Sequence, residues 1–357
     1  TDGEDRIAIG THNHLYILEN DALYDITPLR KTTSNLTNPL KTTDESTTII
    51  VTDNSHGAIS GDFVVINSAA AIGGITAATL NQSEGYQITV LTANTYSITV
   101  SSAATSTVAA GGGTTIDIKY LIGVAAGLGQ QSGDPALGWG TGSWGGSTWG
   151  TARSTDSSDV KLSNSQWSLN LWGEDLIATV RGGAIYYYDT SSSPNRAVLV
   201  SSLAGATSVP TTTTLTTISF PDRHVLALGT DPLSSSGNID PMQVRWSDQE
   251  DFAVWAPTVT NTAGDQRLEV GTKIVSATTS KDETVIATDE ALYGMTFVGP
   301  PFIFSFRLLA ANCGSAGKNV MMTVDSTVFW MGRSNFFVYD GIVKELPCSV
   351  QHFVFER

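Results

Sequence analysis

The segment Glu283-Thr284-Val285-Ile286-Ala287-Thr288, followed by the turn Asp289-Glu290 and by Ala291-Leu292-Tyr293-Gly294-Met295, decides the fold class. An apolar run with a small residue, a polar turn and a second run with an aromatic residue together indicate a β-hairpin. The same pattern, complete or with its first strand alone, occurs at four more places: Arg6–Ile26, Asp175–Asp189, His224–Gly229 and Ser326–Asp340.

The spacing of these hairpins favours one fold. Their starts near residues 175, 224, 284 and 327 lie roughly 43 to 60 residues apart, which matches one four-stranded blade per repeat in a β-propeller. Hairpins also repeat in β-sandwiches, so a two-layer sandwich is the alternative. No capped amphipathic run of useful length is present. We therefore expect an all-β protein with β-propeller-like blades.

A segment of different composition interrupts the repeat. Residues 42–118 are rich in Thr, Ala and Ser and nearly free of aromatic side chains. Alternating runs within them, such as Asp62–Ile66 and Thr95–Val100, predict five short strands and hence a small inserted β-barrel or sandwich. The expected division is a first propeller blade region over 1–40, an inserted small β-barrel domain over 41–119, a Gly/Trp-rich extended loop over 120–156, and propeller blades over 157–357 that are incomplete at the C-terminus.

The Gly/Trp-rich loop carries three tryptophans in Gly-flanked positions, Trp139, Trp144 and Trp149. Their five-residue period suits neither a helix nor a strand. Indole side chains dominate the energetics of many protein interfaces. We expect these residues to anchor contacts between subunits, and packing on their own subunit is the equally weighted alternative.

The charge balance restricts the partners. The chain has 357 residues, with 19 Lys and Arg against 34 Asp and Glu, a formal net charge of −15. Such a surface cannot hold a phosphate backbone by counterion release, so sequence-independent DNA binding is disfavoured. If part of this charge lines a channel, DNA would slide through it without adhering.

No apolar run reaches about 18 residues, so we expect no membrane span, and no signal peptide is visible at the start of the sequence.

The search for chemistry is mostly negative. His12 and His14 form an HxH pair without a third ligand nearby, which favours a solvated turn over a metal site. Cys313 and Cys348 lack CxxC spacing; free buried thiols are expected, with a single disulfide as the alternative.

The strongest catalytic candidates are the clustered acids Asp248, Glu250 and Asp251, since two carboxylates flanking a sugar can hydrolyse a glycosidic bond. Adjacent acids in one turn more often face water. Gly146-Ser147-Thr148-Trp149 resembles the end of the sialidase Asp-box SxDxGxTW, but Trp144 stands where that pattern has its Asp. We expect no catalytic, cofactor-binding or metal-binding residues and no cofactor.

The second half of the chain resembles a known protein family. The sequence is similar to structural proteins of podovirus tails, the packaged-DNA stabilisation and tail-tubular (nozzle) proteins that close the distal end of the tail tube. The residues that carry the resemblance are Val244–Trp255, Asn261–Asp265, Leu268–Ile274, Ala291–Tyr293, Gly299–Phe302, Phe329–Gly332 and Phe337–Gly341.

This resemblance implies a subunit of the virion tail without enzymatic activity. It would assemble as a six-fold ring below the portal, touching the tail adaptor protein and tail fibres, with genomic DNA passing through the channel without specific binding. A receptor-binding adhesion module, with the segment 42–118 as its binding part, is the second reading. A glycan-hydrolysing propeller using Asp248, Glu250 and Asp251 is the third.

Overall fold

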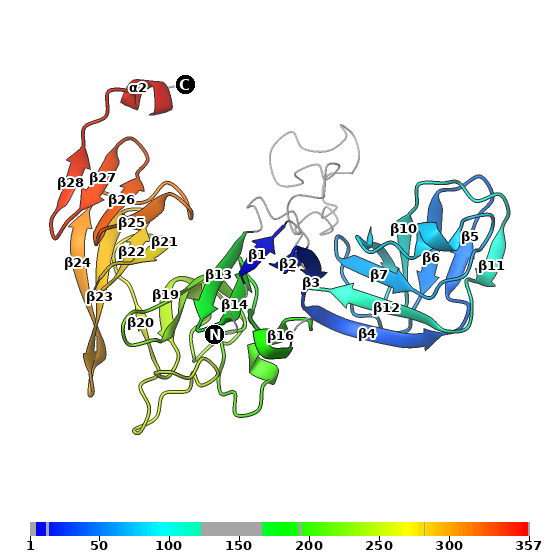
Figure 1. The fold of residues 1–357 in the computed structure, drawn as a ribbon, viewed down its shortest axis with the longest axis horizontal. Helices are drawn as coiled ribbons and strands as arrows, with labels where there is room; N and C mark the ends of the chain where they lie inside the picture. Colours follow the sequence, from blue (N-terminus) through cyan, green and yellow to red (C-terminus); the bar gives the residue numbers. More distant parts are fainter. Residues whose placement is uncertain (1–4, 12–13, 123–165, 193–194, 282, 356–357) are drawn as a thin grey trace, which may run out of the picture. The chain divides into compact units, whose positions relative to one another are not determined.

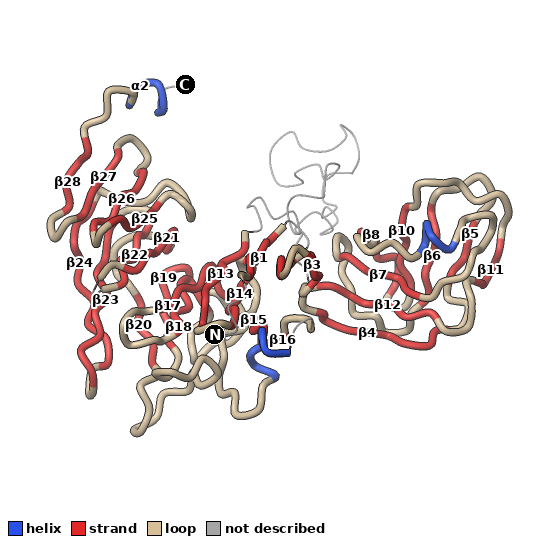
Figure 2. The backbone as a smooth tube through the Cα atoms, viewed as in Figure 1, coloured by secondary structure: helices blue, strands red, loops and turns tan. Residues whose placement is uncertain are grey.

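A computed structural model describes residues 5–11, 14–122, 166–192, 195–281 and 283–355 and is built almost entirely of antiparallel strands (Figure 1, Figure 2). The strands divide between two compact units, which lie within Asp5–Gln166 and within Trp167–Arg357. The expected all-β class is therefore confirmed. Helices are confined to short pieces, among them α1 (Ala77–Leu80) and α2 (Gln351–Phe355).

The first unit begins with a small antiparallel sheet. Its strands β1 (Arg6–Gly10), β2 (Leu15–Glu19) and β3 (Ala22–Asp25) follow one another in chain order. Asn20 and Asp21 connect β2 to β3 with φ angles of 51° and 58°, the backbone that a two-residue hairpin turn requires. The hairpin that the sequence predicts here is present.

The rest of this unit is a two-sheet sandwich, which we call the insert sandwich. One sheet has the order β11-β5-β6-β10-β9 and the other β4-β12-β7-β8. The strands are β4 (Leu29–Leu36), β5 (Leu40–Thr42), β6 (Thr48–Thr52), β7 (Phe63–Asn67), β8 (Tyr86–Gln87), β9 (Thr89–Thr92), β10 (Thr95–Thr99), β11 (Val108–Gly111) and β12 (Ile116–Leu121).

Alternation of buried and open positions builds the core of this sandwich. In β6, Ile49 and Val51 are fully buried between exposed Thr48 and Thr52, as expected for a strand with one face on a core. Side chains of both sheets share one apolar cluster, which includes Ile49, Ile66, Tyr96, Ile118 and Tyr120.

The boundary of the insert differs from the expected one. β4 pairs along its length with β12, from Leu36 opposite Ile116 to Leu29 opposite Leu121. Residues 29–40, which were expected to belong to a first propeller blade, are therefore part of the insert sandwich. The strand that β4 needs as its partner lies about 80 residues later in the chain, and no local pattern reveals that pairing.

The second unit contains four sheets of four strands, each a meander in chain order (Figure 1). Blade 1 is β13 (Trp167–Trp172), β14 (Asp175–Val180), β15 (Ile185–Tyr188) and β16 (Val198–Leu199); blade 2 is β17 (Thr213–Ile218), β18 (Val225–Thr230), β19 (Asp240–Trp246) and β20 (Gly264–Arg267); blade 3 is β21 (Ile274–Thr279), β22 (Thr284–Thr288), β23 (Ala291–Gly299) and β24 (Ile303–Ala311); blade 4 is β25 (Met321–Val324), β26 (Thr327–Met331), β27 (Phe336–Tyr339) and β28 (Val343–Leu346).

The blades pack face to face, and the second strand of each blade shows why. Every residue of β18 is buried, because both faces of this strand are covered. Val225 and Ala227 belong to an apolar cluster shared with blade 1, whereas Leu226 and Leu228 belong to one shared with blade 3. The two-residue period of a strand thus sends alternate side chains to the two neighbouring blades.

Blade 3 repeats this arrangement. Ile286 of β22 joins the cluster shared with blade 2, while Val285 and Ala287 join the cluster that contains Val328 and Trp330 of blade 4. The first strands β13, β17, β21 and β25 also contact one another in succession. Serial stacking of four-stranded meanders through both faces is propeller-like packing, not the two-layer sandwich that was the alternative for these hairpins.

Candidate functional site

Several residues that the sequence singled out lie outside the described part of the chain. Trp139, Trp144 and Trp149 fall in this category, so their expected role as subunit anchors remains a prediction. His12 is also outside the described residues. His14 is buried rather than solvated as the turn position suggested, because its ring stacks on Tyr16 at 5.5 Å between centroids.

The described residues contain no group of three or more His, Cys, Asp or Glu side chains placed to hold a metal ion. Cys313 and Cys348 are both free, so the alternative disulfide does not form. Cys313 is buried as expected, and burial raises the pKa of its thiol to about 11, which keeps the thiol protonated and unreactive. Cys348 is only partly buried.

The acid cluster that was the best catalytic candidate is occupied by structural contacts. The Asp248 carboxylate accepts hydrogen bonds from the Thr262 backbone at 2.8 Å, the Thr262 hydroxyl at 2.7 Å and the Gln249 backbone at 2.9 Å. Burial would raise the pKa of Asp248, but these donors more than offset it and the pKa is lowered. Asp251 accepts from the Ala253 backbone, and Glu250 forms an exposed ion pair with Arg223.

A triad-like set of residues lies next to this cluster, and sequence reasoning missed it. The imidazole of His224 is fully buried, with Nδ1 2.7 Å from Asp222 Oδ2 and Nε2 3.0 Å from Thr262 Oγ1. In a nucleophilic triad the hydroxyl donates its proton to the histidine. Here the Thr262 hydroxyl donates to Asp248 instead and also accepts from the Gln249 backbone.

The set is therefore a structural network and not a nucleophile with its base. The two ring nitrogens of His224 contact the Asp222 carboxylate and the Thr262 hydroxyl, so the ring is held from both sides. The His224 ring also packs against Phe297 and Phe304 of blade 3. These contacts join the β18 and β20 ends of blade 2 to its neighbour.

Blades 2 and 3 each contain a further set of hydrogen bonds, centred on one Asp carboxylate, which we call the carboxylate staple. In each of these blades the second strand ends on a Thr that an Asp follows, Thr230-Asp231 and Thr288-Asp289. Asp231 accepts hydrogen bonds from the backbone and hydroxyl of Thr211, and Asp289 from the backbone and hydroxyl of Thr272. Each staple fastens the segment that enters a blade to the end of its second strand. The repeated Thr-Asp dipeptide was the sequence signal for it.

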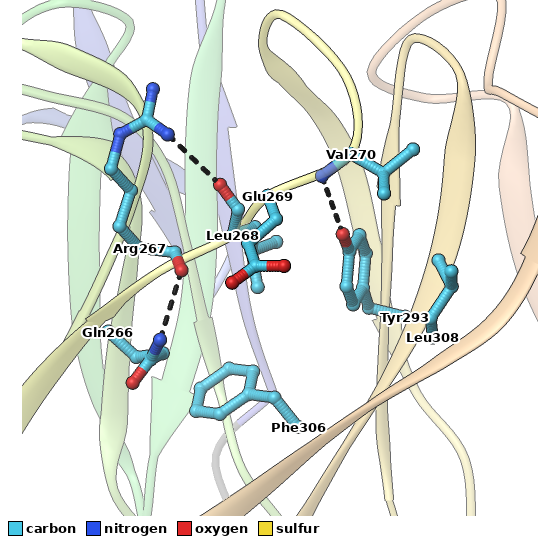
Figure 3. Close-up of a pocket in the computed structure, with 8 residues that line it drawn as sticks. All are labelled: Gln266, Arg267, Leu268, Glu269, Val270, Tyr293, Phe306 and Leu308. Atoms are coloured by element: carbon cyan, nitrogen blue, oxygen red, sulfur yellow. Dashed lines mark hydrogen bonds between the residues drawn. The ribbon is translucent and has the colours of Figure 1, made fainter.

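A groove of about 290 Å³ lies between blades 2 and 3 (Figure 3). The rings of Tyr293 and Phe306 lie on one side, and Gln266 and Arg267 lie on the other. The Tyr293 hydroxyl accepts a hydrogen bond from the Val270 backbone at 2.7 Å, which fixes that ring. Aromatic faces beside planar polar groups are the kind of surface that binds polar ring-shaped ligands.

A second, smaller cavity lies between the first strands of blades 1, 2 and 3 and the segment that leads into blade 4; we call it the inner-strand pocket. Its volume is about 190 Å³. It is lined by Trp167–Asn170 of β13, Leu215–Thr217 of β17, Ala277 of β21, and Lys318 and Asn319 before β25. The Lys318 ammonium donates a hydrogen bond to the Trp167 carbonyl at 3.0 Å. This hydrogen bond connects the segment that leads into blade 4 with the first strand of blade 1.

Comparison with known proteins does not assign the chain to a family. No protein-family model and no curated protein matches the chain. A solved structure of the phage phi92 endosialidase aligns with 92% of this chain and 52% of its own length, at 14% sequence identity and a TM-score of 0.27. The chain thus spans about half the length of that protein. The β-propeller-like architecture described above rests on the strand topology and the shared cores of the blades.

Proposed function

We propose that the chain is a structural subunit of the virion tail of a short-tailed bacteriophage, within the nozzle through which DNA leaves. The observation that carries the proposal is the serial stacking of blades through buried faces on both sides, as in β18 and β22. Such stacking leaves few sheet edges free and gives a stiff wall. The position in the nozzle comes from the sequence resemblance to podovirus tail proteins.

Three further features support a structural role. The acid cluster at Asp248 is used to fasten a loop to its blade, as described above. The net charge of −15 suits a surface past which DNA slides without adhering. The long hairpin of β23 and β24 carries exposed apolar side chains near its tip, Val298 and Phe302, the kind of residue that subunit interfaces cover.

Localisation on virions tests this proposal. Gold-labelled antibodies against the purified chain should bind at the distal tip of the tails of the phage that encodes it. Labelling of the capsid shell, or of infected cells with none on finished virions, would contradict the proposal. Antibodies raised against the insert sandwich alone provide a second, independent label of the same subunit.

A specific observation favours a second candidate function, glycan adhesion. The groove between blades 2 and 3 combines the rings of Tyr293 and Phe306 with the side chains of Gln266 and Arg267. Replacing Phe306 with Ala should abolish binding of the chain to capsule polysaccharide under this reading. Retained binding by that variant, or binding that only deletion of the insert sandwich removes, would exclude the groove as the site.

A further inference from the structure

The inner-strand pocket contains an unusual arrangement of charge. Lys318 is half-buried at its wall, and Arg181, in the turn after β14, is the charged group that acts on it electrostatically. Among the described residues neither cation has a carboxylate within ion-pair distance, whereas Arg30, Arg223 and Arg267 are each paired. Lys318 thus lies at a cavity under the repulsion of a like charge, with no carboxylate within ion-pair distance among the described residues.

The cost of this arrangement is visible at Lys318. Burial, reinforced by the repulsion of Arg181, lowers the pKa of the ammonium to about 8. A cation that loses solvent and gains no counter-charge is destabilised in its charged form. An anion in the pocket would supply the missing counter-charge to Lys318.

The pocket also offers uncharged donors. The Ser168 side chain is buried, and its hydroxyl has no hydrogen-bond partner among the described residues. The Asn319 amide is exposed at the rim, and the Lys318 ammonium keeps two N–H bonds beyond the one it gives to Trp167. Hydroxyl, amide and ammonium donors together suit an oxyanion, which only accepts hydrogen bonds.

We propose that the inner-strand pocket binds a small oxyanion, the carboxylate or phosphate group of a ligand, through Lys318 and Ser168, with Arg181 adding to the positive potential. The cavity of about 190 Å³ is smaller than the 300–1,000 Å³ typical of sites for drug-sized ligands, so it suits a single such group. This site goes beyond the structural function proposed above and stands or falls independently of it.

Calorimetric titration of the whole chain tests the proposal with three probes: inorganic phosphate, glucuronate and uncharged glucose. Phosphate, glucuronate or both should bind, and glucose should not. Binding of phosphate alone would assign the pocket to phosphate groups, and binding of glucuronate alone would assign it to carboxylates. Absence of binding by both anions, or equal binding of glucose and glucuronate, would overturn the proposal.

Variants locate the site. Lys318→Gln should weaken anion binding by about tenfold or more, the expected loss for a charged hydrogen bond. The matched control is Lys344→Gln, because Lys344 is exposed and already paired with Asp340 at 2.9 Å. Ser168→Ala provides a second test if Lys318→Gln fails to fold. If Lys318→Gln binds the anion as tightly as the control does, the assignment is wrong. If Lys318→Gln does not fold, an unchanged anion affinity in Ser168→Ala would overturn the assignment.

The pH dependence gives a readout that a purely structural lysine would not give. The strand segments that line the pocket carry no titratable side chain, so Lys318 is the titratable group among its lining residues. Glucuronate, whose carboxylate stays ionised, should therefore bind more weakly as the pH rises from 7 to above 9 and Lys318 loses its proton. An affinity that is constant over this range would contradict a role for the Lys318 charge.

Discussion

The carboxylate staple of blade 2 makes a quantitative prediction for Asp231→Asn. Asp231 is fully buried, and its Oδ2 accepts hydrogen bonds from the Thr211 hydroxyl at 2.8 Å and from the Gly237 backbone at 2.9 Å. Its Oδ1 accepts from the Thr211 backbone at 3.2 Å and from the Thr212 backbone at 3.4 Å. All of these partners donate hydrogen bonds to the carboxylate. In Asp231→Asn, the amide nitrogen that replaces one oxygen is itself a donor, so it cannot accept the hydrogen bonds that this oxygen received.

The expected loss follows from these contacts. A hydrogen bond to a charged group contributes about 1.5–3 kcal/mol, and the amide nitrogen forfeits two of them. We expect Asp231→Asn to lower the free energy of unfolding by about 3–6 kcal/mol, a value at the upper end for single substitutions. Urea denaturation followed by tryptophan fluorescence measures it, with Asp340→Asn as the exposed control that should leave the midpoint unchanged.

The contribution of Asp231 to the free energy of unfolding should decrease as the pH falls. Burial would raise the pKa of Asp231, but the donors of Gly237, Thr211 and Thr212 overcome this and lower it. A lowered pKa in the folded state means that the staple stabilises fully above the unfolded value of about 4 and loses this contribution as the pH falls below it. A loss of under about 1 kcal/mol in Asp231→Asn, or a parallel loss of stability by the wild type and the variant on acidification, would contradict this role of the Asp231 carboxylate.

Three more substitutions test the account. Leu226→Ala should destabilise the protein by about 2–5 kcal/mol, because Leu226 is fully buried between blades 2 and 3; a small change in the urea midpoint would contradict that packing. His224→Gln should lower the thermal midpoint because it removes the ring's hydrogen bonds with Asp222 and Thr262, and an unchanged midpoint would show that the network does not stabilise the blades. Phe302→Asp should leave the fold intact but prevent assembly, since Phe302 is 79% exposed; size-exclusion chromatography that shows unchanged assemblies would exclude the hairpin tip as an interface.

Local patterns were sufficient to predict the blades. The hairpins at Asp175–Asp189, Glu283–Met295 and Ser326–Asp340 are present because their apolar runs, turns and aromatic strands are all adjacent in the sequence. Their spacing also predicted the four-strand repeat. The two-sided burial of Val225–Leu228 could be anticipated from a continuous apolar run, although the identity of the neighbouring blades could not.

The sequence did not reveal contacts between residues that lie far apart in the chain. The strand Leu29–Leu36 has a partner about 80 residues later, so its membership of the insert sandwich has no local signal. The His224 network depends on Asp248 and Thr262, which lie in separate turns of the blade. The inner-strand pocket needs three strands from different blades and the segment before a fourth, which brings Lys318 to the Trp167 carbonyl. Polar contacts of this kind leave no periodic trace in a sequence.

Negative-stain imaging of the purified chain, combined with mass photometry, tests the proposed structural role most directly. A nozzle subunit should form six-fold rings with a mass of six times 37.7 kDa, about 226 kDa. Particles that remain at the mass of a single chain at all concentrations, or that form open filaments rather than closed rings, would contradict it.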